Sequence, residues 1–367
     1  MFALHIDTAR TWRGGQNQVL LTVLGLRARE HRALLVAHPA GELYRRAREG
    51  PDLVPLAPRT EVDLSAAWKL SRIIRQWNPT VVHAHDPHAV AMAGLALSFG
   101  APTPTPRLVA SRRVDFHLQT HSFSRWKYRQ VDLFIAASRA IRDILVDDGI
   151  PATQITVVHD GIDVDKISRL PTIEIRAEFW LPHGVPLLAN VGALVAHKGQ
   201  KHLVEAMRHV LQDVPDVHTV VFGEGELRPA LEKQIRERRL EKRVLLAGFR
   251  EDVLSLVKSA DLFVMSSVTE GLGSTVLDAM AMGLAVVGTN AGGISEAVVH
   301  GETGLLVSPG DPEALAEAIV SLLKAPDVRR RMGEAGRTRV LEHFGVDRLV
   351  EGTLAAYTAV TKRAGVA

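Results

Sequence analysis

The sequence predicts an α/β protein of two doubly wound domains, each built on a parallel sheet with helices on both faces. Short apolar strands alternate with amphipathic helical stretches, and this alternation occurs twice along the chain. The strands are apolar throughout, as in parallel sheets that are buried on both faces. At 367 residues, of which 46% are hydrophobic, the chain is also longer than one core usually serves.

Seven candidate strands, with helices between them, lie in the first half of the chain. Each is a short run dominated by Val, Leu, Ile, Ala and Phe. The helical stretches place apolar residues three and four positions apart, as Leu70, Ile73, Ile74 and Trp77 do, so that one face packs on the sheet. The strands are Phe2–Asp7, Ala33–Ala37, Leu53–Leu56, Thr80–Ala84, Arg107–Ala110, Asp132–Ala136 and Ile155–Val158; the helices include Gln16–Arg29, Leu64–Trp77, His88–Ser98 and Ser138–Asp148.

The second half repeats this alternation after a break near Ile167–Thr172. We therefore expect 1–168 to form an N-terminal domain and 169–346 a C-terminal domain. A final helix, Asp347–Arg363, lies in the remaining segment 347–367 and is expected to cross back onto the first domain. The strands of the second half are Pro186–Val191, His218–Phe222, Val244–Ala247, Asp261–Met265, Ala285–Gly288 and Gly304–Val307.

Composition excludes several classes of protein. The absence of Cys rules out disulfides, thiolate zinc sites, iron–sulfur clusters and a cysteine nucleophile. From the acid early in the first ten residues we expect no signal peptide, and no run reaches the ~20 apolar residues of a membrane span, which predicts a cytoplasmic chain. Residues 1–170 carry six more basic than acidic residues, which suits a phosphate or a lipid surface as partner. Peripheral contact with the inner face of an anionic membrane stays open, whereas an aromatic content of 5% gives nucleic acid no support.

Three loops could hold a phosphate group at the start of a helix. Glycine lets a ligand approach backbone N–H groups closely, and such loops occur at Gly14-Gly15, at Gly192–Gly199 and at Glu270–Thr275. The alternative for Gly14-Gly15 is a flexible loop. For Gly192–Gly199 it is a loop in which Lys198 is merely solvated, and for Glu270–Thr275 it is an ordinary helix cap. The G-x-G-x-x-G fingerprint is missing after the first strand, and no Walker motif occurs, which argues against a dehydrogenase and an ATPase.

Two acids could bind a sugar. Asp278 follows Glu270 by eight positions, about one turn into the next helix, so the two carboxylates could share a pocket. Carboxylates accept hydrogen bonds from paired hydroxyl groups, which sugars and ribose offer. The alternative is a capping role for Glu270 and an ordinary surface position for Asp278.

The longer segment around these acids resembles a known family. TEGLGSTVLDAMAMGLAVVGTNAGGISEAVVHGETGLLVSPGDPEALAEAI is similar to the signature segment of retaining glycosyltransferases of the family 4 type, the glycosyl transferases group 1. GQNQVLL, VVHAHDP, AASRAIRDIL, VVHDGIDVD, VGALVAHKG, VFGEGELRPAL, VLLAGFREDV and ADLFVMSS follow the family's order over nearly the whole chain. The resemblance implies a GT-B fold, in which two Rossmann-like domains face each other across a cleft, with the acceptor on 1–168 and a nucleotide-sugar donor on 169–346.

The resemblance also implies roles for individual residues. Glu270 would bind the hydroxyls of the transferred sugar, Asp278 the ribose and Lys198 the donor pyrophosphate, which Gly14 and Gly15 would also approach. With His85, Glu270 and Lys198 are the catalytic candidates. The donor-binding candidates are Gly14, Gly15, Gln16, Gly192, Lys198, Gly248, Phe249, Arg250, Glu270, Gly271, Leu272, Gly273, Ser274, Thr275 and Asp278.

The chain departs from the family pattern in three places. Asp278 stands where Glu is usual, and Ala193 stands where an Arg is usual, which leaves Lys198 as the remaining cation of that pair. Arg113 occupies a position where many members carry His. Arg112, Arg113 or His197 could supply the missing charge, and the residues assigned to the acceptor side or to charge compensation are Arg112, Arg113, His83 and His85.

The run His83-Ala84-His85-Asp86-Pro87-His88 raises the question of a metal. A hydrolytic zinc motif would need Asp at position 87, where this chain has Pro. Polar groups on the substrate side and a structural role are the other interpretations. The family works without a bound divalent ion, so we expect no metal and no cofactor beyond the nucleotide-diphosphate sugar.

The sequence thus predicts a glycosyltransferase that moves a sugar from a nucleotide-diphosphate sugar to an acceptor hydroxyl with retention of configuration. The acceptor is expected to be a glycan or a lipid-linked glycan of the cell envelope, such as lipopolysaccharide or a glycolipid. A non-hydrolysing nucleotide-sugar epimerase and a non-catalytic nucleotide-sugar-binding protein remain alternatives.

Overall fold

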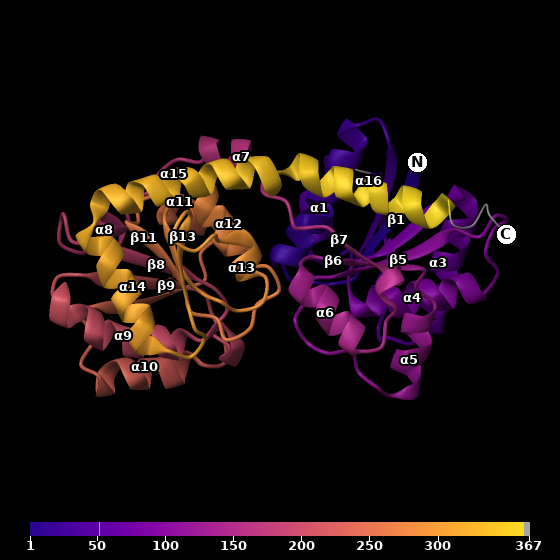
Figure 1. Ribbon diagram of the computed structural model, residues 1–367. Coiled ribbons are helices and arrows are strands. Elements are labelled where there is room, and N and C mark those ends of the chain that lie inside the picture. Colours follow the sequence, from indigo (N-terminus) through magenta and orange to yellow (C-terminus); the bar gives the residue numbers. More distant parts are fainter. Residues whose placement is uncertain (51, 363–367) are drawn as a thin grey trace. The chain divides into compact units, whose positions relative to one another are not determined.

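The computed structural model describes residues 1–50 and 52–362, which form two compact units (Figure 1). Unit 1 comprises Met1–Gly161 together with the C-terminal helix from Val346, and unit 2 comprises Ile162–Gly345. Each unit contains one parallel sheet with helices packed on both faces. The expected fold class of two doubly wound α/β domains is confirmed, and each predicted strand is present with ends shifted by at most two residues.

The sheet of unit 1 has the order β3-β2-β1-β4-β5-β6-β7. The chain adds strands on one side of β1 and then returns to add β4 on the other, so the strand order reverses between β1 and β4. Loops that follow such a reversal diverge and leave room for a ligand. The strands are β1 Phe2–Asp7, β2 Arg32–Ala37, β3 Asp52–Pro55, β4 Val81–Ala84, β5 Arg107–Arg112, β6 Leu133–Ala136 and β7 Ile155–Val157.

Two apolar clusters cover the two faces of this sheet. Helices α3 and α4 contribute to one cluster, and α1 and α16 to the other. Helices α16 and α1 lie side by side in Figure 1, and Gly25 of α1 permits this packing because an added Cβ would overlap the side chain of Val350. The helices are α1 Gly14–Ala28, α2 Glu42–Ala47, α3 Leu64–Trp77, α4 Pro87–Ser98, α5 Ser122–Arg129, α6 Arg139–Asp147 and α16 Val346–Lys362, with a 3₁₀ turn at Ala152–Gln154.

The sheet of unit 2 has the order β10-β9-β8-β11-β12-β13, with its reversal between β8 and β11. Two apolar clusters again cover its faces. The strands are β8 Leu187–Val191, β9 His218–Phe222, β10 Val244–Gly248, β11 Leu262–Met265, β12 Val286–Thr289 and β13 Gly304–Val307. The helices are α7 Val164–Arg169, α8 Ile175–Glu178, α9 Gln200–Asp213, α10 Arg228–Glu237, α11 Val253–Val257, α12 Ser274–Ala281, α13 Ile294–Ala297, α14 Pro312–Lys324 and α15 Pro326–His343, with a 3₁₀ turn, η2, at Ala196–Lys198.

The division between the units falls at 161/162, earlier than the expected 168/169. The reason is that Val164 and Ile167 of α7 are buried in a core cluster of unit 2. The last helix begins at Val346 and is described as far as Lys362, so Arg363 and the rest of the predicted segment to 367 lie outside the described residues. Among the described residues, no helix is both long and apolar enough to cross a membrane.

Candidate functional site

Glycines let the loops at the carboxyl ends of the strands of unit 2 touch one another. Gly199, with φ 63°, lies so close to the loop after β11 that an added Cβ would overlap the carbonyl oxygen of Ser266. Gly292, with φ 50°, stands in the same relation to the carbonyl oxygen of Glu270. Only glycine combines a positive φ with this approach. Gly292 was not among the predicted site residues, although a glycine pair soon after an apolar strand was a signal for it.

The structure brings two of the three predicted catalytic residues together. Lys198 ends the turn η2 after β8, and Glu270 lies in the loop after β11, the neighbouring strand across the reversal. The Lys198 Nζ lies 2.5 Å from the Glu270 Oε2, and the side chains are only 19% and 11% exposed. The Ser267 hydroxyl donates a second hydrogen bond to the same oxygen, at 3.2 Å. The two charges therefore compensate each other in a largely buried place.

Helix α12 begins beside this ion pair. Its N-cap is Gly273 in the left-handed conformation, and within the described residues no side chain caps the helix, so the N–H groups of Ser274 and Thr275 stay open to an anion. A Cβ added at Gly273 would lie 3.5 Å from the Cγ of Glu270, which places the helix start next to the acid. Thr275 donates its hydroxyl to the carbonyl oxygen of Val191 at 3.3 Å and so ties the helix to β8.

Asp278 lies one turn further along α12 and is half-buried. Burial raises the pKa of its carboxyl group to about 7. Among the described residues, neither Glu270 nor any other side chain forms a hydrogen bond with this carboxyl group. A carboxyl group that is shielded from water and has no hydrogen-bond partner in the protein is suited to bind a ligand that donates a hydrogen bond to it.

The other donor-binding candidates of unit 2 differ in their exposure and in whether their side chains already form hydrogen bonds. Phe249, after β10, is 65% exposed. Arg250 already forms hydrogen bonds within the protein. Its Nε and Nη2 donate to Asp252 at 2.7 and 2.8 Å, and its Nη1 donates to Glu178 at 2.6 Å. These hydrogen bonds raise the pKa of the Arg250 guanidinium. Gly271 and Leu272 are buried, Ser274 is half-buried, Gly248 ends β10, and Gly192 packs beside the Lys198 side chain.

In unit 1, Gly14 and Gly15 form the first residues of α1, after β1. Gln16 is buried and acts within the protein: its Nε2 donates to the Asp7 Oδ2 at 3.1 Å, and its Oε1 accepts the backbone N–H of Arg13 at 3.1 Å. Burial, with a neighbouring carboxylate as second cause, raises the pKa of Asp7 to about 6. The side-chain amide of Gln16 thus fixes the loop that carries the glycine pair.

Three buried histidines gather at the carboxyl ends of β1 and β4. The nitrogens of His5, His83 and His85 lie within 4.8 Å of one another, close enough to ligate one ion. The His85 Nε2 lies 2.9 Å from the His5 Nδ1, and His83 contacts the hydroxyls of Tyr357 at 2.6 Å and Ser111 at 2.8 Å. Burial lowers the pKa of all three, that of His5 to about 3, so the rings are neutral at neutral pH.

Arg113 fixes the direction of these hydrogen bonds. Its Nη1 donates to the His85 Nδ1 at 3.3 Å, and its Nε donates to the Asp160 Oδ1 at 2.9 Å. A neutral imidazole that accepts at Nδ1 carries its proton on Nε2, so His85 donates to His5. His85 is therefore engaged at both nitrogens, and Arg113 puts a positive charge beside any cation that the three histidines could hold.

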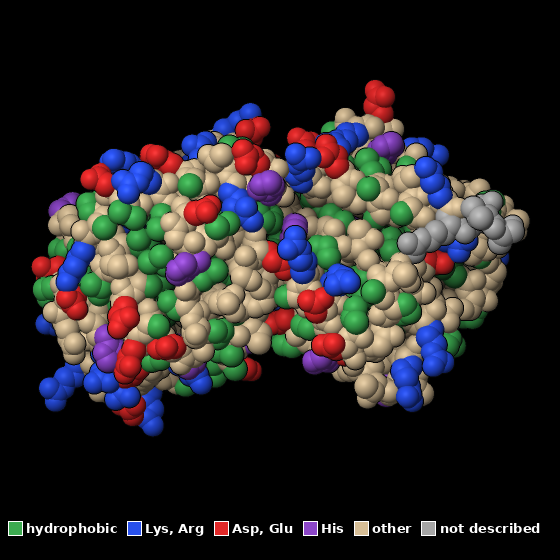
Figure 2. Space-filling view, viewed as in Figure 1, with side chains coloured by type: hydrophobic (Ala, Val, Ile, Leu, Met, Phe, Trp, Pro, Cys, Tyr) green, Lys and Arg blue, Asp and Glu red, His purple; other side chains and the backbone are tan. Residues whose placement is uncertain are grey.

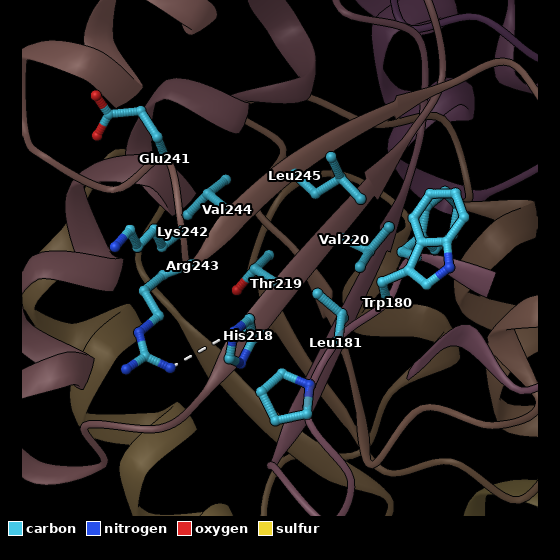
Figure 3. A pocket seen from close by; sticks show the side chains of 12 residues that line it. Trp180, Leu181, His218, Thr219, Val220, Glu241, Lys242, Arg243, Val244 and Leu245 are labelled. Atoms are coloured by element: carbon cyan, nitrogen blue, oxygen red, sulfur yellow. Dashed lines mark hydrogen bonds between the residues drawn. The ribbon is translucent and has the colours of Figure 1, made fainter. Parts of the chain in front are cut away.

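A separate cavity of about 470 Å³ opens at the amino ends of β9 and β10, the sheet edge opposite Lys198 and Glu270 (Figure 3). Trp180, 92% exposed, lines the cavity, and Arg243 points toward His218, with the Arg243 Nη1 and the His218 Nε2 3.5 Å apart. None of the predicted site residues lines this cavity.

The surface charges and the packing of α3 bear on the proposed contact with a membrane. Figure 2 shows basic and acidic side chains interspersed on the visible face of both units. The predicted apolar face of α3 packs on its sheet: Leu70 and Ile74 are buried there, and Ile73 and Trp77 contact the same core. This is the packing that the spacing of these apolar residues predicts.

Comparison with known proteins agrees with this architecture. The family models "Glycosyl transferases group 1" and "Glycosyltransferase Family 4" match residues 172–339 and 12–166. The alpha-maltose-1-phosphate synthase of Mycolicibacterium smegmatis is 31% identical over 310 residues, which cover 77% of this chain and 79% of that protein. The glycogen synthase of Mycobacterium tuberculosis is 29% identical over 300 residues, which cover 78% and 70%.

A solved structure is similar over nearly the full length. HepE of Anabaena, in complex with UDP and glucose, has a TM-score of 0.83 at 22% identity and covers 98% of this chain and 100% of its own. At this identity the likeness concerns the fold, which is GT-B. The chain belongs to the glycosyl transferases of group 1 and is a sugar transferase.

Proposed function

We propose that this enzyme transfers a sugar from a nucleoside-diphosphate sugar to an acceptor hydroxyl with retention of anomeric configuration. The observation that carries the proposal is the Lys198–Glu270 ion pair, which joins the loops after β8 and β11 beside the uncapped start of α12. A cation, open N–H groups and a carboxylate in one place match the diphosphate and the hydroxyls of such a donor. The UDP and glucose bound by HepE support this donor class.

The residues suggest how charge moves in the reaction. When the bond from the anomeric carbon to the diphosphate breaks, negative charge develops on the leaving oxygen, which Lys198 and the start of α12 stabilise. The acceptor oxygen forms the new bond on the face that the diphosphate leaves, and its proton passes to the leaving phosphate. The diphosphate attracts Lys198 away from Glu270, whose freed carboxylate accepts hydrogen bonds from the sugar, and Asp278 accepts one from the ribose.

Two further assignments concern the donor base and cofactors. The exposed ring of Phe249 provides a stacking surface for the base, next to Arg250, which its ion pairs hold in place. The transfer needs no resident metal or other cofactor, since Lys198 and the backbone supply the positive charge that the diphosphate requires.

The acceptor is a glycan or lipid-linked glycan of the cell envelope, and the enzyme meets it at an anionic membrane surface. Exposed apolar side chains at the start of α3, Val62, Leu64 and Trp68, support this. The Arg72 guanidinium lies 5.1 Å from the centre of the Trp68 ring, so a cation accompanies the apolar group, as in membrane-surface helices.

A panel of nucleotide sugars tests the donor and the reaction. Thermal unfolding should identify the nucleoside diphosphate that stabilises the protein, and the matching donor should then be cleaved with release of that diphosphate. NMR of the product should show the same anomeric configuration as the donor. Donor binding without cleavage would favour a non-catalytic binding protein, and formation of an isomeric nucleotide sugar would favour an epimerase.

A further inference from the structure

Unit 1 contains a pocket of about 300 Å³ at the carboxyl ends of β1, β4 and β5. Three arginines line it: Arg13 from the loop after β1, Arg112 at the end of β5, and Arg113 directly after it. Gly15, at the start of α1, also lines it. We refer to this cavity as the arginine pocket.

Not all N–H donors of these arginines are used within the described protein. Arg113 uses two of its five N–H donors, on Asp160 and His85. Arg112 donates from Nη2 to the carbonyl oxygen of Phe116, and its buried Nε has no partner. Within the described part of the chain, the Arg13 guanidinium makes no hydrogen bond or ion pair. Arg13 is exposed, so water satisfies its donors, whereas the unpaired buried Nε of Arg112 is costly unless a ligand accepts from it.

Among the described residues, Arg13 and Arg112 form no ion pair with the acids near the pocket. Asp86 is the single carboxylate in the described lining, and it caps α4: its oxygens accept the N–H groups of Thr8 at 2.7 Å and Ala89 at 2.8 Å. Asp115 lies close enough to influence Arg112 electrostatically but forms no hydrogen bond with it. Asp160 pairs with Arg113 at 2.9 Å and compensates its charge.

The buried histidines hold one of these charges in a fixed orientation. Arg113 is anchored by Asp160 on one side and by neutral His85 on the other, and His85 is in turn held by His5. A guanidinium with a fixed orientation loses little entropy when it binds a planar or tetrahedral anion through two parallel hydrogen bonds. The histidine cluster thus positions Arg113.

We propose that the arginine pocket binds a carboxylate or phosphate group carried by the acceptor. The proposal rests on the proposed glycosyl transfer, because it assigns the acceptor's chemical class. The volume suits one small acid or one phosphorylated head group. The donor diphosphate is the other source of the same chemistry, and the experiment separates the two.

The test measures thermal unfolding of the full chain with inorganic phosphate or succinate, against NaCl at equal ionic strength, with and without saturating UDP. At least one probe should raise the unfolding temperature above the NaCl control, and this rise should persist with UDP present. Arg13→Gln and Arg112→Gln should each weaken probe binding by about tenfold. Arg125→Gln, an exposed arginine on α5, is the matched control and should bind as the wild type does.

The outcomes separate this proposal from the proposed function. If UDP abolishes the effect of both probes, the pocket belongs to the diphosphate and the assignment to the acceptor is wrong. If neither probe stabilises the protein, or if Arg13→Gln and Arg112→Gln change nothing, there is no anion site. These readouts need no turnover, so a failure to find sugar transfer would leave the result on anion binding intact. Arg113→Gln would also leave the Asp160 carboxylate without its partner, so a change in probe binding by this variant would not isolate the contribution of Arg113.

Discussion

Replacing Lys198 by Ala tests the ion pair on which the proposed donor site depends. Removing one preorganised group that stabilises developing negative charge typically lowers kcat by about 100- to 1000-fold. The substitution also leaves Glu270 without its partner. Because the two side chains are 19% and 11% exposed, the cost lies between that of breaking a buried pair, about 3–5 kcal/mol, and that of a surface pair, below about 1 kcal/mol. We expect about 1–3 kcal/mol, or a melting temperature lower by about 2–10 °C.

The assay is release of nucleoside diphosphate at saturating donor, combined with thermal unfolding of each variant. Lys201→Ala is the matched control, because Lys201 is an exposed lysine three positions away at the start of α9. It should retain wild-type turnover and stability. A folded Lys198→Ala enzyme with turnover within about threefold of the wild type would refute the assignment of the leaving-group charge to this residue.

Four further results are expected. Gly292→Ala should lower the stability of unit 2 in thermal unfolding more than Gly283→Ala does. Both glycines have a positive φ, but of these two only Gly292 lies where an added Cβ would meet a carbonyl oxygen. Equal losses of stability would contradict this close contact. Asp278 has a pKa of about 7 in the folded protein against 3.8 as its ordinary value, so folding binds a proton and stability falls as pH rises from about 4 to 7. Asp278→Asn should remove that slope and gain about 1–3 kcal/mol at pH 8 in denaturant titrations; an unchanged slope would mean that this carboxyl group titrates normally. Dialysis against EDTA should leave donor cleavage unchanged, and a loss restored by a divalent ion would require a metal. Trp68→Ala should weaken sedimentation with anionic liposomes at low salt, and absence of binding by the wild type would end the membrane proposal.

The sequence was sufficient to predict the strands and their grouping into two sheets. Each strand is an apolar run flanked by turn residues, and these signals are local. The compact units divide seven residues before the expected boundary, because Val164 and Ile167 of the short helix α7 pack in a core of unit 2, and no local pattern shows which core they join. The start of α1 was missed by two residues, since a glycine pair gives no capping signal.

The site was predicted less completely, because its contacts join distant parts of the chain. The family resemblance selected Lys198 and Glu270, and the loops after neighbouring strands bring them together. Sequence alone did not reveal that Arg250 is held by Glu178, which lies 72 positions away, or that Tyr357 on the last helix reaches His83. Such partners depend on how helices pack on a sheet, and no local pattern encodes that.

The two units use one topology for two kinds of electrostatics. In each sheet the strand order reverses beside the central strand, and the loops after the two adjacent strands carry the candidate groups. In unit 2 these loops supply opposite charges that compensate each other, so an anionic ligand can take Lys198 from Glu270 and free the acid for hydroxyl groups. In unit 1, neutral His85 from the loop after β4 and the carboxylate of Asp160 both hold Arg113, so its guanidinium stays in place whether or not a ligand is bound. The first arrangement suits a group whose charge changes during the reaction, and the second suits a group that only has to be held.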